Sequence, residues 1–190
     1  MNSLPTQNNI NETSPASYKS KHKLKNKIGR FLWIITYNLF FKHSPPLFSN
    51  WRRLLLILFG AKIGNIWIHP KAQIWAPWLL EAGDDVFIDR NVFLYNTYGI
   101  KIANRVIISA NVVLCTPSHN YENPFYPLIG NSIVINNDCW ICADAYVLPG
   151  IHIGTGAVIG ARSVVTKNVD EWTVVAGNPA RRIKERKLNS

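Results

Sequence analysis

Aliphatic residues recur at every sixth position through the C-terminal half of this 190-residue chain. An α-helix repeats every 3.6 residues and a flat strand every two, so neither structure requires a strict period of six. A period of six is typical of a parallel β-helix, in which each hexapeptide forms one face of a three-sided coil. The pattern thus predicts an all-β solenoid with aliphatic side chains inside and mostly small residues at the corners. The aliphatic positions are Ile135, Ile141, Val147, Ile153, Ile159 and Val165, and four positions after each come Cys139, Ala145, Ile151, Ala157, Ser163 and Val169.

The same spacing extends toward the N-terminus with interruptions. Two steps of eight residues, from Leu80 to Ile88 and from Leu94 to Ile102, predict two-residue bulges at corners. The spacing from Leu114 to Ile135 is 21, three more than one coil of 18 residues. The intervening segment, residues 116–131, is rich in Pro, Asn and aromatic residues and predicts a loop that protrudes from the coil. Loops of this length in compact domains are usually functional or disordered, and its aromatic content argues against disorder.

Positive charge is concentrated near the N-terminus of a chain whose formal net charge is +10. Residues 1–62 hold ten Lys or Arg and one acidic residue, whereas residues 63–190 hold eleven Lys or Arg and ten acidic residues. The predicted solenoid, residues 63–190, is therefore almost neutral. We expect no nucleic acid partner, because such partners require basic residues spread across a folded face. Residues 1–18 are polar and predict a disordered tail.

Residues 19–62 form a basic and apolar appendage before the solenoid. Within it, Phe31–Phe41 and Trp51–Phe59 predict two helices, each shorter than the roughly 20 apolar residues that span a bilayer. One interpretation is that the helices cap the open end of the solenoid, where strand edges would otherwise be exposed. The other is a peripheral membrane contact through residues 19–59, with Lys and Arg attracted to anionic lipid. We expect capping, with membrane contact as an added role.

The three cysteines predict free thiols in a reducing compartment. Cys139 and Cys142 form a CxxC pair, but both occupy positions that this repeat fills with small residues. A structural role is therefore favoured over a redox or zinc role. With Cys115 unpaired in the same domain, we expect a cytoplasmic protein, peripheral at the inner face of the membrane if the appendage touches lipid.

Several short elements follow one another in a fixed order along the chain. They are Phe59-Gly-Ala-Lys-Ile-Gly64, Ser118-His119-Asn-Tyr121, Asn137-Asp-Cys-Trp140, Val147-Leu-Pro-Gly150, Val164-Val-Thr-Lys167 and Val175-Ala-Gly-Asn-Pro-Ala180. In this order they resemble the hexapeptide-repeat acyltransferases, and most closely the colanic-acid-type exopolysaccharide O-acetyltransferases. That group is similar to the galactoside and maltose acetyltransferases. The resemblance covers roughly residues 24–188.

The resemblance implies a left-handed β-helix, a handedness that runs against the general preference for right-handed crossovers. It also implies a homotrimer with acetyl-CoA in the groove between neighbouring subunits, and a sugar acceptor, lipid-linked or nucleotide-linked, in exopolysaccharide synthesis. A head-to-tail ring of three subunits leaves no open edge. Asn178-Pro179 resembles an N-cap and first turn, which predicts a short C-terminal helix.

Acetyl transfer to a sugar hydroxyl needs a base that takes the hydroxyl proton and donors that hold the oxyanion. His119 is the candidate base, because imidazole titrates near neutral pH and the residue lies on the segment that interrupts the coil. The resemblance places the family's catalytic histidine at the same position. The sequence leaves its orienting partner open between Glu122 and a backbone carbonyl.

The resemblance also implies binding residues. A substrate contact falls at Asn96, with Asn91 or Asp89 as alternatives, and a structural corner residue is an equally good interpretation of Asn96. Contacts to acetyl-CoA fall at Trp140, Ala143, Ala161, Thr166, Lys167, Arg181 and Lys184. Small residues allow backbone groups to approach the pantetheine amides, and the cations can meet phosphates. The alternative for Arg181 and Lys184 is a solvated helix face.

Two other functions compete with this interpretation. A γ-class carbonic anhydrase needs three zinc-binding histidines, but His119 has no other histidine within thirty residues, so we expect no metal. A non-catalytic sugar-binding or scaffold protein could share the coil. The His119 segment, together with the Thr-Lys and Gly-Asn-Pro-Ala elements, argues against it.

Overall fold

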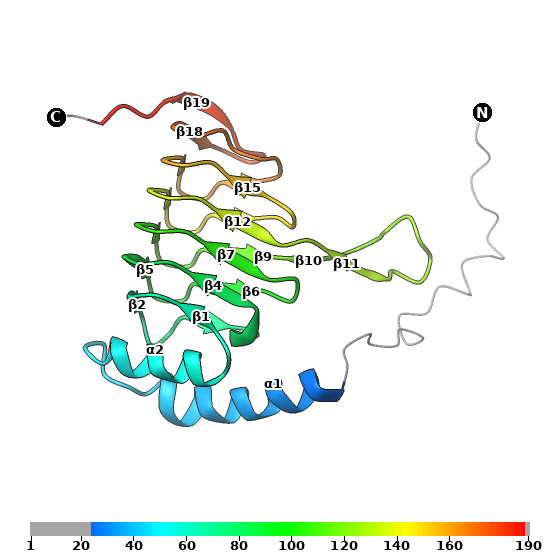
Figure 1. Ribbon diagram of the computed structural model, residues 1–190. Helices are drawn as coiled ribbons and strands as arrows, with labels where there is room; N and C mark the ends of the chain where they lie inside the picture. The colour runs from blue at the N-terminus through cyan, green and yellow to red at the C-terminus, as the bar shows by residue number, and fades with distance from the viewer. Residues whose placement is uncertain (1–23, 189–190) are drawn as a thin grey trace.

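The computed structural model describes residues 24–188, which form a parallel β-helix standing on two helices (Figure 1). The chain visits three sheets in turn, which we name A, B and C. Sheet A contains β1 (Lys62–Ile63), β4 (Leu80–Ala82), β7 (Ile100–Ile102), β12 (Ile133–Ile135) and β15 (His152–Ile153). Sheet B contains β2 (Ile66–Ile68), β5 (Val86–Ile88), β8 (Ile107–Ile108), β13 (Trp140–Ile141), β16 (Val158–Ile159), β18 (Thr173–Ala176) and β19 (Arg181–Glu185). Sheet C contains β3 (Gln73–Ile74), β6 (Phe93–Tyr95), β9 (Val113–Cys115), β14 (Tyr146–Val147) and β17 (Val164–Val165).

The predicted aliphatic ladder forms the core of the coil. All six aliphatic residues of the C-terminal half are buried, and so are the six residues at the mostly small positions. Equivalent residues stack directly, as in the pairs Ile135 with Ile153 and Val147 with Val165. The strict six-residue prediction is therefore confirmed for this half of the chain.

The lower coils are longer than the upper ones. The corner bulge predicted between Leu94 and Ile102 is confirmed, whereas the one predicted between Leu80 and Ile88 lies before Ala82. Ile68 pairs with Ile88, a 20-residue coil, whereas Ile141 pairs with Ile159, an 18-residue coil. The extra residues lie at the corner between sheets C and A. Ile74 pairs with Leu94 and Ala82 with Ile102, so the step of eight residues runs from Ile74 to Ala82 and again from Leu94 to Ile102. Leu80 and Ala82 are the two inward residues of β4.

The 21-residue spacing from Leu114 to Ile135 also has a different origin from the one predicted. Leu114 lies in sheet C and Ile135 in sheet A, so the two residues lie on successive faces and are not separated by a full coil. The segment between them is an antiparallel hairpin of β10 (Pro117–His119) and β11 (Leu128–Gly130) that projects from the coil (Figure 1). A corner insertion of this kind leaves the stacked core below and above it undisturbed.

Polar ladders tie the coils together at the corners. Asn91, Asn111 and Asp144 each have a positive φ and stack at the corner between sheets B and C. Asn91 Nδ2 donates to Asn111 Oδ1 at 3.1 Å, and Asn111 Nδ2 donates to Asp144 Oδ1 at 2.9 Å. Asn and Asp tolerate this left-handed conformation better than other side chains do. Their recurrence therefore fixes where the chain turns.

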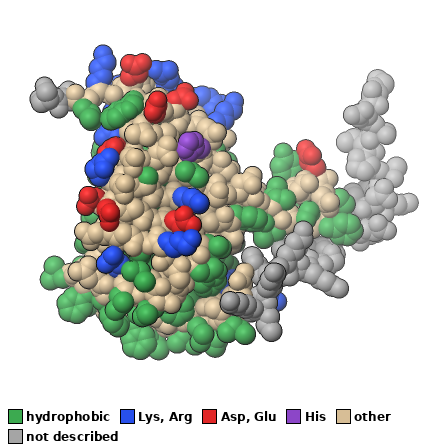
Figure 2. All heavy atoms as spheres, viewed as in Figure 1, with side chains coloured by type: hydrophobic (Ala, Val, Ile, Leu, Met, Phe, Trp, Pro, Cys, Tyr) green, Lys and Arg blue, Asp and Glu red, His purple; other side chains and the backbone are tan. Residues whose placement is uncertain are grey.

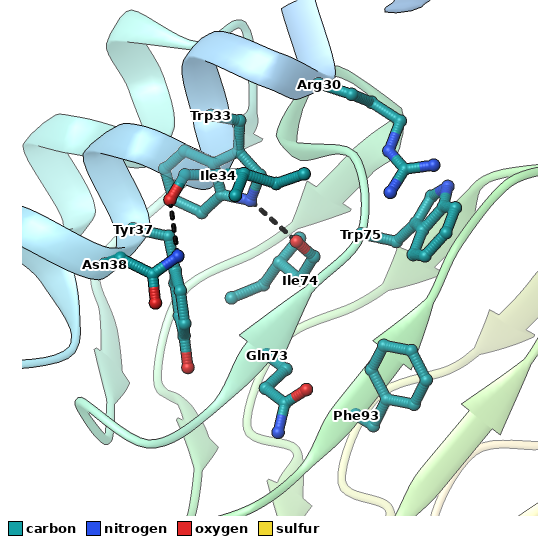
Figure 3. Close-up of a pocket in the computed structure, with 9 residues that line it drawn as sticks. All are labelled: Arg30, Trp33, Ile34, Tyr37, Asn38, Gln73, Ile74, Trp75 and Phe93. Carbon is teal, nitrogen blue, oxygen red and sulfur yellow. Dashed lines mark hydrogen bonds between the residues drawn. The ribbon is translucent and has the colours of Figure 1, made fainter.

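The N-terminal helices close the lower end of the coil, as predicted. Helix α1 (Leu24–Thr36) continues into the π-helical turn Tyr37–Phe41, and α2 is Ser49–Leu58; a 3₁₀ turn, Pro77–Leu79, precedes β4. Trp33, Phe41 and Leu56 are buried in the same apolar cluster as the first coil. Trp33 Nε1 donates to the carbonyl of Ile74 at 2.7 Å (Figure 3).

Two further sequence predictions concern the segment before the coil, the disordered tail and the absence of a membrane-spanning helix. The disordered tail, residues 1–18, and the start of the basic run lie outside the described residues. Within residues 24–188, none of the helices has the length and apolar content that crossing a bilayer requires.

The predicted short C-terminal helix is wrong. Residues 181–185 form strand β19, which pairs antiparallel with β18 and completes sheet B. Asn178-Pro179 is a cis peptide in the turn before this strand and does not start a helix. The local N-cap pattern is overridden because the free edge of β18 offers a full set of backbone hydrogen bonds.

Arg52 provides a test of how the cap is fixed. Its side chain is fully buried and donates to the carbonyls of Ile68, Pro45 and Pro46 at 2.7, 2.7 and 2.6 Å. Arg52→Met should lower the free energy of unfolding by about 3 kcal/mol, because it leaves the buried Ile68 carbonyl and two partly buried carbonyls without a donor. Urea unfolding at one fixed protein concentration measures this change. Arg90→Met, at an exposed corner, is the control, and an equal effect of both variants would contradict the account.

Candidate active site

The β10–β11 hairpin carries the candidate base. It leaves the coil at the corner between sheets C and A, after β9, and returns into β12 (Figure 1). His119 pairs with Leu128 across the hairpin, and its side chain is exposed. The histidine is thus displayed outside the coil by backbone pairing and not by a flexible loop.

The root of the hairpin is fixed by residues that the sequence did not single out. Thr116 Oγ1 donates to the Tyr95 carbonyl at 2.8 Å and accepts from the Tyr98 N–H at 3.0 Å. A Cβ at Gly130 would lie 2.5 Å from Cδ2 of the Tyr98 ring, so only glycine fits there. These contacts set the angle at which the hairpin leaves the coil. Nothing in their local sequence marks them, because they act through long-range packing.

The His119 ring is oriented by a backbone carbonyl. Nδ1 lies 2.5 Å from the carbonyl oxygen of Tyr126. A carbonyl oxygen only accepts hydrogen bonds, so in the neutral ring the proton lies on Nδ1 and the lone pair on Nε2. Of the two partners that the sequence left open, the structure therefore shows a carbonyl. Nε2 is the atom with the basicity that proton abstraction needs.

Asn96 does not present its side chain to a ligand. It is fully buried, its Oδ1 accepts from the Ala76 N–H at 3.0 Å, and its Nδ2 donates to the Ala76 carbonyl at 2.8 Å. Asn96 thus bridges two coils, which is the structural role that the sequence left open beside a substrate contact. Asn91 belongs to the corner ladder, and Asp89 Oδ1 accepts from the Arg90 N–H at 2.6 Å. Asp89 is half-buried, and its side chain does not bridge two coils as the side chains of Asn96 and Asn91 do.

The predicted cofactor residues fall on two different corners of the coil. Ala143 and Ala161 follow β13 and β16 at the corner between sheets B and C, where the Arg162 N–H donates to the Ala143 carbonyl at 3.0 Å. Thr166 and Lys167 follow β17 at the corner between sheets C and A, the corner from which the hairpin also projects. All of these side chains except Ala143 are exposed.

The other three predicted cofactor residues lie in sheet B. Arg181 begins β19 opposite Ala176, and Lys184 lies opposite Val174; both are exposed. Trp140, 44% exposed, lines a groove of about 370 Å³ on the outer surface of sheet B with Ile107 and Trp172, and its Nε1 donates to Ser109 Oγ at 3.0 Å. Within one chain, the predicted cofactor residues therefore lie at the corner between sheets B and C, at the corner between sheets C and A, and in sheet B.

Comparison with known proteins places this geometry in a family. A family model for bacterial transferase hexapeptides with six repeats matches residues 132–167. The chain is 41% identical over 162 residues to WcaF of Escherichia coli K12, which is named as a colanic acid biosynthesis acetyltransferase; the match covers 85% of this chain and 89% of WcaF. The chain belongs to the hexapeptide-repeat acetyltransferases.

Other members support the same assignment. The galactoside O-acetyltransferase of E. coli K12 is 30% identical over 149 residues, which cover 76% of this chain and 73% of that enzyme. A hexapeptide-repeat acetyltransferase of Vibrio cholerae, solved in complex with acetyl coenzyme A, superposes with a TM-score of 0.80 at 25% identity, covering 94% of this chain and 98% of that one. This acetyltransferase therefore shares both the sequence pattern and the fold of its relatives.

The cysteines of this acetyltransferase are consistent with a structural role. Cys139 is buried, its Sγ donates to the Gly154 carbonyl at 3.1 Å, and burial raises the pKa of its thiol to about 11. Burial also raises the pKa of Cys142. Within residues 24–188, no three His, Cys, Asp or Glu side chains gather as metal ligands would.

Thiol labelling tests this environment. A pKa about two units above the ordinary value leaves about 100-fold less thiolate at pH 8, and the thiolate is the reactive form. Iodoacetamide should therefore modify Cys139 at least about 100-fold more slowly in the native protein than in 6 M guanidinium chloride. Peptide mass spectrometry at timed intervals gives the rate at each cysteine. Rapid native labelling of Cys139, or a Cys139–Cys142 disulfide formed under mild oxidation, would contradict the structural role.

Proposed function

We propose that this acetyltransferase moves an acetyl group from acetyl-CoA to a sugar hydroxyl, and that it serves the synthesis of an exported polysaccharide. The observation that carries the proposal is the orientation of His119, whose Nδ1 donates to the Tyr126 carbonyl and leaves the lone pair on Nε2. The relatives support the donor and the acceptor: one is named for galactoside O-acetylation, one for colanic acid synthesis, and one was solved with acetyl coenzyme A.

His119 acts as a general base in this proposal. Its Nε2 takes the proton from the acceptor hydroxyl while the hydroxyl oxygen bonds to the thioester carbonyl carbon. The carbon–sulfur bond then breaks, and the imidazolium returns the proton to the departing sulfur. The Tyr126 carbonyl stabilises the imidazolium, because it continues to accept from Nδ1–H while Nε2 is protonated. The products are an acetyl ester and free CoA, so atoms and charge balance.

The residues for holding acetyl-CoA fit its chemistry. Ala143 and Ala161 stack at one corner and present backbone with little side chain, which suits close approach of a chain with amide groups. Lys167, Arg181 and Lys184 are exposed cations that can pair with phosphates. We assign Thr166 a polar contact at the same corner as Lys167, and Trp140 a flanking apolar contact on sheet B.

A homotrimer would unite these parts. Within one chain, the width of sheet C, on the order of 15 Å, separates the hairpin corner from the Ala143–Ala161 corner. A closed ring of three brings the hairpin corner of one subunit beside the neighbouring subunit's other corner. We therefore propose a homotrimer in which each active site takes His119 from one subunit and Ala143 and Ala161 from the next.

The acceptor is a sugar on a lipid-linked or nucleotide-linked precursor, and Asp89 replaces Asn96 as our candidate for its contact. Cys115, Cys139 and Cys142 are free thiols, which favours a reducing, cytoplasmic setting for the reaction. A non-catalytic sugar-binding protein is the competing function. It would have no need of a histidine oriented by a backbone carbonyl on a paired hairpin.

Replacement of His119 tests the base. His119→Ala should lower kcat by about 10²–10⁴-fold, the usual contribution of general base catalysis, and leave the affinity for CoA nearly unchanged. The measurement is CoA thiol release with acetyl-CoA and a panel of sugar acceptors, together with calorimetric titration of CoA. His152→Ala, at an exposed position on β15, is the matched control and should remain active. Unchanged turnover in His119→Ala would exclude the proposed base, and no acceptor-dependent release by the parent protein would favour the non-catalytic alternative.

Mixed assemblies test whether the active site is shared between subunits. His119→Ala and Ala161→Trp should each be inactive alone, the second because its ring fills the space for the pantetheine. Co-expressed in equal amounts, they should recover about a quarter of the parent activity, because random assembly pairs an intact His119 with an intact neighbouring Ala161 at about one site in four. No recovery from mixed assemblies would show that both residues serve one site within a single chain.

A further inference from the structure

The lower end of the molecule is an apolar surface that nothing in the coil covers. More than half of the large exposed apolar side chains in residues 24–188 come from the two N-terminal helices and their connection, and Figure 2 shows them gathered at the base. Single exposed apolar residues are normal, but a contiguous apolar surface marks an interaction site. We call this surface the base; its residues are Ile28, Phe31, Leu32, Ile34, Ile35, Leu39, Phe40, Leu47, Phe48, Trp51, Leu54, Ile57 and Leu58.

The cap of the coil does not require these side chains. On α2, Leu55 and Leu56 are buried against the first coil, whereas Leu54 and Leu58 are 46% and 70% exposed. On α1, Trp33 is buried, whereas Phe31 is 63% exposed. Capping of the coil therefore explains only why the inward face of each helix is apolar. A polar outward face would close the coil equally well, so the apolar outward face has a separate purpose.

The part of the sequence that contains the base carries positive charge only. Residues 13–80 hold eleven Lys or Arg and no Asp or Glu, so every acidic residue except Glu12 lies at position 81 or later. Two copies packed base to base would bring equal charges together, which disfavours a second copy as the partner. Apolar side chains flanked by Lys and Arg are instead the composition of a helix that lies in the plane of an anionic membrane.

A cavity at the edge of the base fits an anionic headgroup. It measures about 260 Å³ and lies between α1 and sheet C, with Arg30, Tyr37, Asn38 and Trp75 among its lining residues (Figure 3). The Arg30 guanidinium stacks on the Trp75 ring at 3.2 Å from the ring centroid. Its Nε is buried and has no hydrogen-bond partner among the described residues. A buried donor of this kind is costly unless a ligand accepts from it, and a phosphate oxygen is a suitable acceptor.

We propose that the base docks on the surface of an anionic phospholipid bilayer, with its apolar side chains in the interface and Arg30 on a lipid phosphate. The helices lie on the membrane and do not cross it, in agreement with their length. The coil then stands upright on the membrane, because α1 and α2 lie across its lower end (Figure 1). This inference does not depend on the proposed acetyl transfer, since docking requires neither His119 nor a substrate.

Vesicle co-sedimentation of the full-length chain tests the proposal. The protein should sediment with vesicles of phosphatidylcholine and phosphatidylglycerol at 7:3, and at least about tenfold less with pure phosphatidylcholine or in 0.5 M NaCl. The triple variant Phe31→Ser, Leu39→Ser, Leu47→Ser should partition at least about tenfold more weakly into the anionic vesicles, because all three side chains are mostly exposed in solution. Arg30→Gln should weaken binding to anionic vesicles more than binding to neutral ones, because choline offsets the phosphate charge in phosphatidylcholine.

Matched controls separate docking from misfolding and from self-association. Ile183→Ser on β19, at the opposite end of the coil, and Lys101→Gln on β7 remove an exposed apolar and an exposed basic side chain away from the base, and both should sediment like the parent protein (Figure 1). Thermal unfolding should be the same for every variant compared. The proposal is overturned if the parent protein stays in the supernatant with anionic vesicles, or if Ile183→Ser loses binding as strongly as the triple variant. It is equally overturned if light scattering without vesicles shows that the triple variant halves the molar mass, because the base would then bind a second copy.

Discussion

The stack of aliphatic side chains inside the coil is the constraint on which the rest of the structure depends. Each strand is only two to five residues long and would not be stable alone, but its inward residue packs on equivalents in the coils above and below. The backbone of each coil pairs with its neighbours in parallel register, so a shift in one coil would misplace the next. The interior therefore fixes the three corners, and the candidate site residues lie at those corners and on the faces between them.

Corner positions can change without affecting the stack, and this explains how the coil accommodates the hairpin that carries His119. The β10–β11 hairpin is inserted between β9 and β12, yet Leu94 pairs with Leu114 below it and Ile135 with Ile153 above it as in any other coil. The same freedom allows an exposed alanine at 161. At the lower end, the helices seal the stack with one face and leave the other exposed. A coil upright on a membrane would suit an acceptor carried by a lipid.

The sequence predicted the coil well because its period of six depends on a local rule, one inward residue in each face. The rule was insufficient where contacts distant in sequence decide the structure. Asn178-Pro179 has the local features of a helix start, but the edge of β18 draws residues 181–185 into a strand. Asn96 has the polarity of a binding residue, but the Ala76 backbone takes both ends of its amide. The partner of the His119 ring could not be predicted from sequence, because it is the backbone carbonyl of Tyr126 and every residue type has a backbone carbonyl.

The most direct test of the account is a crystal structure of the enzyme with CoA and an acceptor sugar. The account predicts that Nε2 of His119 lies within about 2.6–3.2 Å of the acceptor hydroxyl, the reach of a general base. It also predicts that the CoA sulfur lies beside that hydroxyl and that the pantetheine runs along the Ala143 and Ala161 corner of a neighbouring subunit. A CoA bound wholly within one chain, or a His119 ring facing away from both ligands, would contradict the account.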